Sequence, residues 1–228
     1  MMSISQQLLS VQARINNACI KSKGHNYDQV ILVAVSKTKP LNMVLEAYDQ
    51  GQRHFGENYL QDALDKISAN SHKDIVWHFI GAVQSNKTRS IAENFAWVHT
   101  IEREKIAQRL NDQRPAELPP LKVCLQVNIS SEANKSGVSL ADLPSLAAKV
   151  NALPRLELAG LMCIPAANQT QVEQEQAFAD MAKAQQQLQQ TYPQLTELSM
   201  GMSADLELAI AHGATMVRIG TDIFGARN

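Results

Sequence analysis

The sequence predicts an α/β fold, a (β/α)8 barrel with an extra N-terminal helix, as a single domain over residues 1–228. Strand-like apolar segments alternate with helical stretches, and no two strand-like segments follow each other directly. From Ser36, at the end of the first segment, to Gly220, at the end of the eighth, the chain advances 184 residues, about 26 per step. That spacing suits one strand, one helix and two short loops. A doubly wound open sheet is the alternative, but no G-x-G-x-x-G follows the first strand, which weakens its dinucleotide-binding version.

The N-terminal segment is expected to form an amphipathic helix. Its apolar residues recur at steps of three and four, at Ile4, Leu8, Val11, Ile15 and Ala18. We expect this helix to end near Gly24, because glycine readily closes a helix.

The first βα unit follows. Residues 30–35 form a short β-branched run, which is typical of a strand buried on both faces. After Pro40, apolar residues at helical spacing predict a helix that stops at Gly51. The other predicted strands are 54–56, 75–81, 96–101, 121–129, 156–164, 197–200 and 216–220, each followed by a helix except the last.

Two unusual stretches fit within this pattern. Residues 114–120 contain three prolines, but they lie where a loop must connect the fourth helix to the fifth strand. The glutamine-rich residues 185–190 keep a helical stripe with Phe178 and Met181, so we interpret them as the solvated face of a helix.

The composition excludes several functional classes. Net charge is −1, from 21 Lys and Arg against 22 Asp and Glu, so no nucleic-acid or anionic membrane partner is expected. The cysteines are three, widely separated and without C-x-x-C spacing, and the six histidines show no ligand spacing, so neither a disulfide framework nor a metal site is expected. No signal-peptide segment or membrane span is seen, which favours a cytoplasmic protein. We expect a monomer.

Candidate functional residues follow the predicted strands, at the end of the barrel where such folds place their sites. Lys37 and Lys39 come directly after the first strand. A lysine at the lip of an apolar cavity has its pKa depressed by desolvation and can form a Schiff base. The two-residue period of a strand gives both lysines the same parity, so spacing does not choose between them.

The C-terminal units contain a candidate phosphate site. Ser203 is expected at the N-cap of a helix after the seventh strand, and Gly220 and Thr221 follow the eighth. The loops after strands seven and eight commonly bind phosphate in this fold. Arg218 shares its strand face with Met216 and Gly220, which predicts a guanidinium that points into the barrel.

Together these residues favour pyridoxal 5′-phosphate (PLP), which combines a phosphate, an aldehyde for a lysine and a ring nitrogen for an arginine. A phosphosugar Schiff-base aldolase would also use the lysine and the phosphate site. It has no use for Arg218 against a ring.

Nine blocks of the sequence together match a known family. They are Val33-Ala-Val-Ser-Lys-Thr-Lys-Pro40, His54-Phe-Gly-Glu-Asn58, Trp77-His-Phe-Ile-Gly81, Gln84-Ser-Asn-Lys87, Gln126-Val-Asn128, Gly160-Leu-Met162, Met200-Gly-Met-Ser203, Val217-Arg-Ile-Gly-Thr221 and Ile223-Phe-Gly225. In these blocks the chain resembles the pyridoxal phosphate homeostasis protein family, whose domain is similar to the barrel of alanine racemase. The resemblance implies that Lys37 is the Schiff-base lysine, that Ser203, Gly220 and Thr221 bind phosphate, and that Arg218 meets the pyridine nitrogen. It also places Asn58 and Met202 near the cofactor. Ala82-Val83 departs from the family's Pro-Leu, so we expect a more mobile loop there.

The resemblance implies a protein that carries or buffers PLP and supports vitamin B6 and amino-acid homeostasis, with PLP-dependent apo-enzymes as recipients. The alternative is a weak PLP-dependent amino-acid racemase or lyase. Racemisation needs a base on each face of the substrate, and alanine racemase takes one from a further C-terminal domain, for which eight residues after Gly220 leave no room. Tyr59 and His78 are the alternative bases that the sequence offers, but we expect a surface role for Tyr59 and a core role for His78. We therefore predict a carrier.

Overall fold

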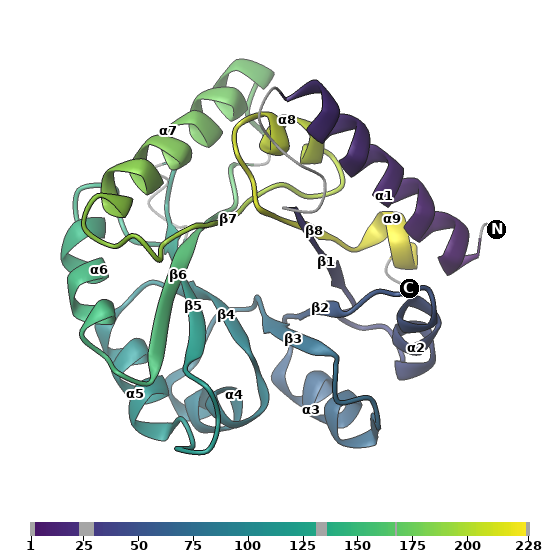
Figure 1. Cartoon of the computed structure of the whole chain (residues 1–228), viewed down its shortest axis with the longest axis horizontal. Coiled ribbons are helices and arrows are strands. Elements are labelled where there is room, and N and C mark those ends of the chain that lie inside the picture. The colour runs from purple at the N-terminus through teal and green to yellow at the C-terminus, as the bar shows by residue number, and fades with distance from the viewer. Residues whose placement is uncertain (1–2, 23–29, 131–135, 167, 227–228) are drawn as a thin grey trace.

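The computed structural model describes residues 3–22, 30–130, 136–166 and 168–226 and shows a closed barrel of eight parallel strands in the order of the chain (Figure 1). The strands are β1 (Ile31–Val35), β2 (His54–Glu57), β3 (Val76–Phe79), β4 (Trp97–Ile101), β5 (Leu121–Val127), β6 (Leu156–Cys163), β7 (Glu197–Ser199) and β8 (Met216–Ile219). Each overlaps its predicted range. The last strand pairs with the first, Val33 beside Arg218, and closes the barrel. The (β/α)8 prediction is confirmed, and the open-sheet alternative is wrong.

The helices lie outside the barrel, as a parallel sheet requires. They are α1 (Ile4–Lys21), α2 (Leu41–Asp49), α3 (Leu60–Ala69), the 3-10 turn η2 (Ser85–Lys87), α4 (Thr88–Asn94), α5 (Glu104–Gln113), α6 (Leu143–Asn151), α7 (Gln171–Gln189), α8 (Leu206–Ala211) and α9 (Thr221–Phe224). One prediction was wrong: the eighth strand is followed by a helix, the single turn α9. Residues 114–120 are a loop, as predicted. The glutamine-rich segment lies on the last turns of α7, also as predicted, but Gln185 is buried and does not belong to the solvated face of the helix.

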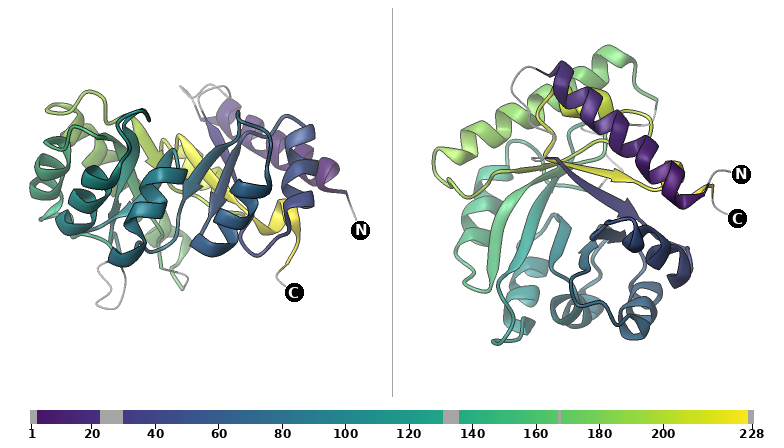
Figure 2. Two further views of the ribbon diagram at one scale, coloured as in Figure 1. Left: turned by 90° about the horizontal axis from the view of Figure 1, so that it is seen from below. Right: turned by 45° about the vertical axis from the view of Figure 1, so that its right-hand side comes forward.

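The N-terminal helix begins with a capping box, in which Ser3 and Gln6 satisfy each other's backbone amides. Its predicted apolar stripe is buried. The helix ends at Lys21, and the predicted closing residue Gly24 lies outside the described residues. α1 packs along α8 and α9, so it covers the barrel beside its last strand (Figure 2).

Two apolar layers hold the barrel. The larger one fills the space between the outer faces of the strands and the helices, where Phe55, Ile91, Leu125 and Phe178 are fully buried. A second cluster, Trp97, Cys124, Ala159, Met162 and Met216, packs together within the barrel. Trp97 and Met216 each precede a polar inward residue, His99 and Arg218, by two positions. The interior therefore changes from apolar to polar toward the carboxyl ends of the strands. Within the described ranges, no helix combines the length and apolarity that crossing a bilayer demands.

Candidate functional site

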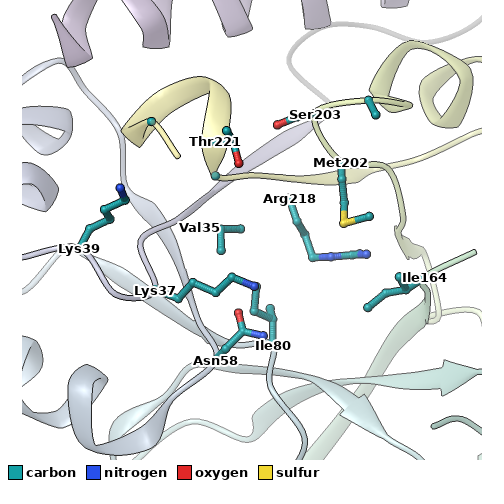
Figure 3. Close-up of a pocket in the computed structure, with 13 residues that line it drawn as sticks. Val35, Lys37, Lys39, Asn58, Ile80, Ile164, Met202, Ser203, Arg218 and Thr221 are labelled. Atoms are coloured by element: carbon teal, nitrogen blue, oxygen red, sulfur yellow. The ribbon is translucent and has the colours of Figure 1, made fainter. Parts of the chain in front are cut away.

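A cavity of about 310 Å³ opens at the carboxyl ends of the strands (Figure 3). Every residue that the sequence analysis proposed for the site lines this cavity: Lys37, Asn58, Met202, Ser203, Arg218, Gly220 and Thr221. The cavity thus joins loops that are up to 184 residues apart in the chain, from Lys37 to Thr221. Val35, Ile80 and Ile164 supply apolar walls.

The turn after β1 separates the two candidate lysines. The N–H of Lys39 donates to Ser36 O at 3.0 Å, which puts Lys37 and Thr38 at the centre of a β-turn. Thr38 has φ of 62°, in the left-handed region that costs a threonine about 1–2 kcal/mol. Lys37 extends into the cavity toward Asn58 and Ile80 (Figure 3). Lys39 also lines the cavity, but its Nζ donates to Ala226 O at 2.7 Å.

Asn58 follows β2, and its backbone is held by a close approach of Gly81. A Cβ on Gly81 would lie 2.2 Å from Asn58 O, so only glycine fits there. The side-chain oxygen Oδ1 of Asn58 is buried and accepts no hydrogen bond from any group in the described ranges. Since buried polar atoms are nearly always paired, an oxygen of this kind beside a cavity is typical of a ligand site.

Arg218 enters the barrel from β8, as predicted, and is 5% exposed. Its Nη1 donates to Ser199 Oγ at 2.7 Å, and its Nη2 donates to Cys163 O at 3.0 Å. No carboxylate pairs with it among the described residues. A buried charge without a counter-ion is costly, so an acceptor that enters the cavity gains a strong, preoriented donor.

A line of three histidines continues from Ser199 through the barrel interior. His99 Nδ1 lies 2.7 Å from Ser199 Oγ, His99 Nε2 lies 2.9 Å from His78 Nδ1, and His78 Nε2 lies 2.9 Å from His54 Nδ1. Arginine can only donate, so Ser199 Oγ accepts from it. Among the described residues His99 Nδ1 is the one other partner of Ser199 Oγ, so the hydroxyl proton is assigned to His99 Nδ1. It follows that both His99 and His78 carry their proton on Nε2. The direction of every hydrogen bond in this line is set by Arg218.

The line is electrically neutral. Burial, with a smaller contribution from the Arg218 charge, lowers the pKa of His99 to about 3. Burial, followed by the neighbouring His99 and His54, lowers the pKa of His78 well below its ordinary value. Both imidazoles therefore stay unprotonated near neutral pH, and Arg218 carries the positive charge of this part of the barrel.

Two of the predicted phosphate residues, Ser203 and Thr221, lie on the opposite side of the cavity from Asn58 (Figure 3). Ser203 is not an N-cap, which corrects the prediction: α8 begins at Leu206 with Asp205 as its N-cap residue. The reason is a tighter turn, in which Met202 N donates to Asp205 Oδ1 at 2.6 Å and Asp205 N donates to Met202 O at 3.1 Å. The Ser203 hydroxyl is thereby left to the cavity. Gly220 passes close to β1, because a Cβ at this position would lie only 3.2 Å from the carbonyl oxygen of Val35.

Arg14 of α1 ties these loops together, a role that sequence reasoning missed. Its Nη2 donates to Ser203 O at 2.9 Å and its Nη1 to Asp222 Oδ2 at 2.6 Å, while Nε binds Glu207 at 2.7 Å. The extra N-terminal helix thus fixes both loops that carry the predicted phosphate ligands.

The remaining chemical candidates lie elsewhere. Tyr59 is 53% exposed and does not line the cavity, and both ring nitrogens of the buried His78 are already bonded. These are the surface and core roles predicted for them. The described residues include no group of three or more His, Cys, Asp or Glu arranged to hold a metal ion.

Comparison with known proteins decides the family. Residues 12–228 match the family described as alanine racemase, N-terminal domain. The pyridoxal phosphate homeostasis protein of Escherichia coli strain K12 is 52% identical, over 100% of this chain and 98% of that protein. The chain belongs to the pyridoxal phosphate homeostasis protein family. The resemblance noted in the sequence is confirmed.

Solved structures agree with this family. PipY of Synechococcus elongatus PCC7942, solved without PLP, is 38% identical with a TM-score of 0.87, over 98% of this chain and 100% of that chain. A structure of PipY with PLP bound matches at 36% identity and a TM-score of 0.84, over the same shares. Alanine racemase of Clostridium difficile 630 is 12% identical with a TM-score of 0.75, over 99% of this chain and 57% of that chain. That last likeness is one of fold alone.

Proposed function

We propose that this protein binds PLP in the cavity and carries or buffers it for PLP-dependent apo-enzymes, as a cytoplasmic monomer. The observation that carries the proposal is the cavity itself, which combines a lysine amine, two hydroxyls and a buried guanidinium that pairs with no carboxylate of the described residues. The unpaired Asn58 Oδ1 supports a polar ligand there. Membership of a family whose E. coli relative is named a pyridoxal phosphate homeostasis protein, and the bound PLP of PipY, support the choice of ligand.

Each lining residue has a role in holding the cofactor. Lys37 would bind it covalently, through a Schiff base between its Nζ and the aldehyde carbon formed with loss of water. Ser203, Gly220 and Thr221 would hold the phosphate. Arg14 would keep their loops in place through its hydrogen bonds to Ser203 O and to the Asp222 carboxylate. Arg218 would donate to the pyridine nitrogen, and Asn58 and Met202 would line the ring.

Arg218 also limits the chemistry. When bound, PLP supplies an electrophilic aldehyde and an electron-withdrawing ring. A guanidinium cannot give up its proton near neutral pH, so it leaves the ring nitrogen unprotonated and weakens the ring as an electron sink. Within the described ranges no Tyr or His side chain lines the cavity, and the Nζ of the second lysine of the lining, Lys39, donates to Ala226 O at 2.7 Å, so no base is placed for the opposite face of a substrate. Both observations favour a carrier over a racemase or lyase.

The lysine assignment is tested by absorbance. We expect the protein mixed with PLP to show the long-wavelength band of a lysine-bound cofactor, and Lys37→Ala to lose it. Borohydride reduction followed by peptide mapping should place the cofactor on Lys37. Lys39→Ala is the matched control, because Lys39 lines the same cavity but binds Ala226 O. A band that survives in Lys37→Ala and disappears in Lys39→Ala would reverse the assignment.

Carrier and enzyme are separated by two assays on the same preparation. PLP transfer to an apo-enzyme should reactivate it, and racemisation or elimination of a panel of amino acids should be very slow. Turnover at about 1 per second or faster would favour the racemase or lyase instead.

A further inference from the structure

A buried charged cluster lies behind the turn that carries Lys37, on the outer side of the barrel. It consists of Lys66 and Asp62 on α3, Glu57 at the end of β2, and Ser36 after β1. Lys66 is 4% exposed and Glu57 is fully buried. None of the four lines the cavity. Lysine and glutamate are rarely buried to this extent, so the cluster calls for an explanation.

Lys66 uses all three of its donors within this cluster. Its Nζ lies 2.8 Å from Ser36 O, 2.8 Å from Glu57 Oε1 and 2.9 Å from Asp62 Oδ2. A helix stripe that buries Leu60 and Ala63 places Lys66 against the strand ends, since residues three apart share one helix face. The ammonium therefore sits at a fixed point between α3 and the turn.

The same carboxylates hold the turn directly. Ser36 Oγ donates to Glu57 Oε1 at 2.6 Å, and Thr38 N donates to Asp62 Oδ2 at 3.0 Å. Ser36 and Thr38 are the two residues that flank Lys37. The cluster thus fixes the backbone immediately before and immediately after the lysine, while the Lys37 side chain points the other way, into the cavity (Figure 3).

We propose that Lys66, together with Glu57 and Asp62, is a positioning residue that clamps the turn at Ser36 and Thr38 and so aims the Lys37 amine into the cavity. This rests on the proposed role of Lys37 as the amine that holds PLP. Lys66 does not itself touch the cofactor.

Stability alone does not explain the cluster. Desolvation raises the pKa of Glu57 even though Lys66 and Ser36 act in the opposite direction. Its Oε2 accepts no hydrogen bond within the described residues. Apolar side chains of similar size in place of a buried ion pair commonly stabilise a fold as well as the pair does, or better. Apolar side chains cannot donate or accept the hydrogen bonds that fix this turn, in which Thr38 has a positive φ of 62°.

The first test compares Lys66→Met with wild type, both without PLP and with it. In the PLP-free protein we expect the amide hydrogen of Thr38 to exchange about tenfold faster, because Asp62 loses the ion pair that holds its carboxylate beside the turn. With PLP, we expect borohydride trapping on Lys37 to slow and the affinity for PLP to fall, each about tenfold. Lys66→Arg keeps the charge and should recover part of each loss.

Arg114→Met is the matched control. Arg114 is also 4% exposed, and its guanidinium donates to the carbonyl oxygens of Ala92, Phe95 and Pro119, none of which lines the cavity. It should lose stability without a change in Thr38 exchange or Lys37 trapping. If Lys66→Met does not fold, Asp62→Ala serves, because the Asp62 side chain is 35% exposed and its loss leaves the Lys66–Glu57 pair intact.

The outcomes for the two proposals are distinct. Folded Lys66→Met or Asp62→Ala with wild-type Thr38 exchange and wild-type trapping would overturn the clamp and leave Lys37 as the PLP lysine. A PLP band that persists in Lys37→Ala would overturn the role of Lys37 and with it the purpose of the clamp, whatever the exchange at Thr38. Faster Thr38 exchange together with slower trapping on Lys37 is the result that supports the proposal.

Discussion

Replacing Ser199 with alanine tests the polar line inside the barrel. Ser199 is fully buried and is the only link between the Arg218 guanidinium and His99 in the described structure. The substitution removes one hydroxyl and adds no bulk. It leaves Arg218 Nη1 without an acceptor and His99 Nδ1 without a donor, and both groups are buried.

The expected cost follows from those two groups. A buried neutral group that loses its partner costs roughly 1–3 kcal/mol, and a charged group costs more, so we expect a loss of about 3–5 kcal/mol in the free energy of unfolding. Urea unfolding of the PLP-free protein measures this loss as a lower midpoint at unchanged slope. Without Ser199 the guanidinium loses one of its two fixed contacts, so PLP should also bind roughly tenfold more weakly.

Thr88→Val is the control, because the Thr88 hydroxyl also links an arginine, Arg109, to a backbone acceptor, and it lies outside the cavity. Arg109 is partly exposed and can turn to water, so this cost should be smaller and PLP binding unchanged. If Ser199→Ala lowers the free energy of unfolding by less than about 1 kcal/mol, the claim that it leaves two buried groups without hydrogen-bond partners is refuted. Nitrogen-15 spectra showing the proton of His99 on Nδ1 would refute the derived bond direction.

Three further predictions concern the interior, the cavity floor and the loops. The pKa values of His78 and His99 are lowered in the folded protein, so both side chains take up protons on unfolding below about pH 6.5. The free energy of unfolding measured in urea should therefore drop by about 3 kcal/mol between about pH 7.5 and 5.5. Equal free energies at the two pH values would contradict this. Gly81→Ala should lower the stability measured by thermal unfolding by roughly 2 kcal/mol or more and weaken PLP binding, because the new Cβ collides with Asn58 O. Unchanged stability and unchanged binding would show that the loop can move to accommodate the Cβ. Arg14→Met should weaken PLP binding about tenfold, measured by absorbance titration, and should leave the Lys37-linked band at saturation unchanged. An unaltered affinity would mean that the two loops keep their conformation without Arg14.

The barrel could be predicted from the sequence because its signals are local. Strands such as β1 are short apolar runs buried on both faces, and each long helix shows its own period. α9 was missed because four residues are too few to show a helical period. The site loops could be predicted as a group because parallel strands bring their carboxyl ends to one face.

Details of the site depend on contacts that a linear pattern does not contain. Strand parity treats Lys37 and Lys39 alike, and the left-handed Thr38 between them is what sends their amines apart. Ser203 and Asp205 are both good capping residues, and only the turn at Met202 decides for Asp205. The histidine line needs the register of neighbouring strands, and the Lys66 clamp had only a faint signal, a lysine on the buried stripe of its helix.

The place of α1 has a consequence for how the chain completes itself. In a regular eightfold barrel each strand is covered by the helix that follows it, but the eighth strand here is followed by the single turn α9, and α1 lies alongside (Figure 2). The covering helix of the last unit is therefore supplied by the opposite end of the sequence. During synthesis, Arg14 emerges long before Asp222, so the two loops that Arg14 joins cannot both be held in place until Asp222 has left the ribosome. A circular permutant that starts at β1 and carries α1 after α9 would make this last contact local, and we expect it to fold faster into the same barrel.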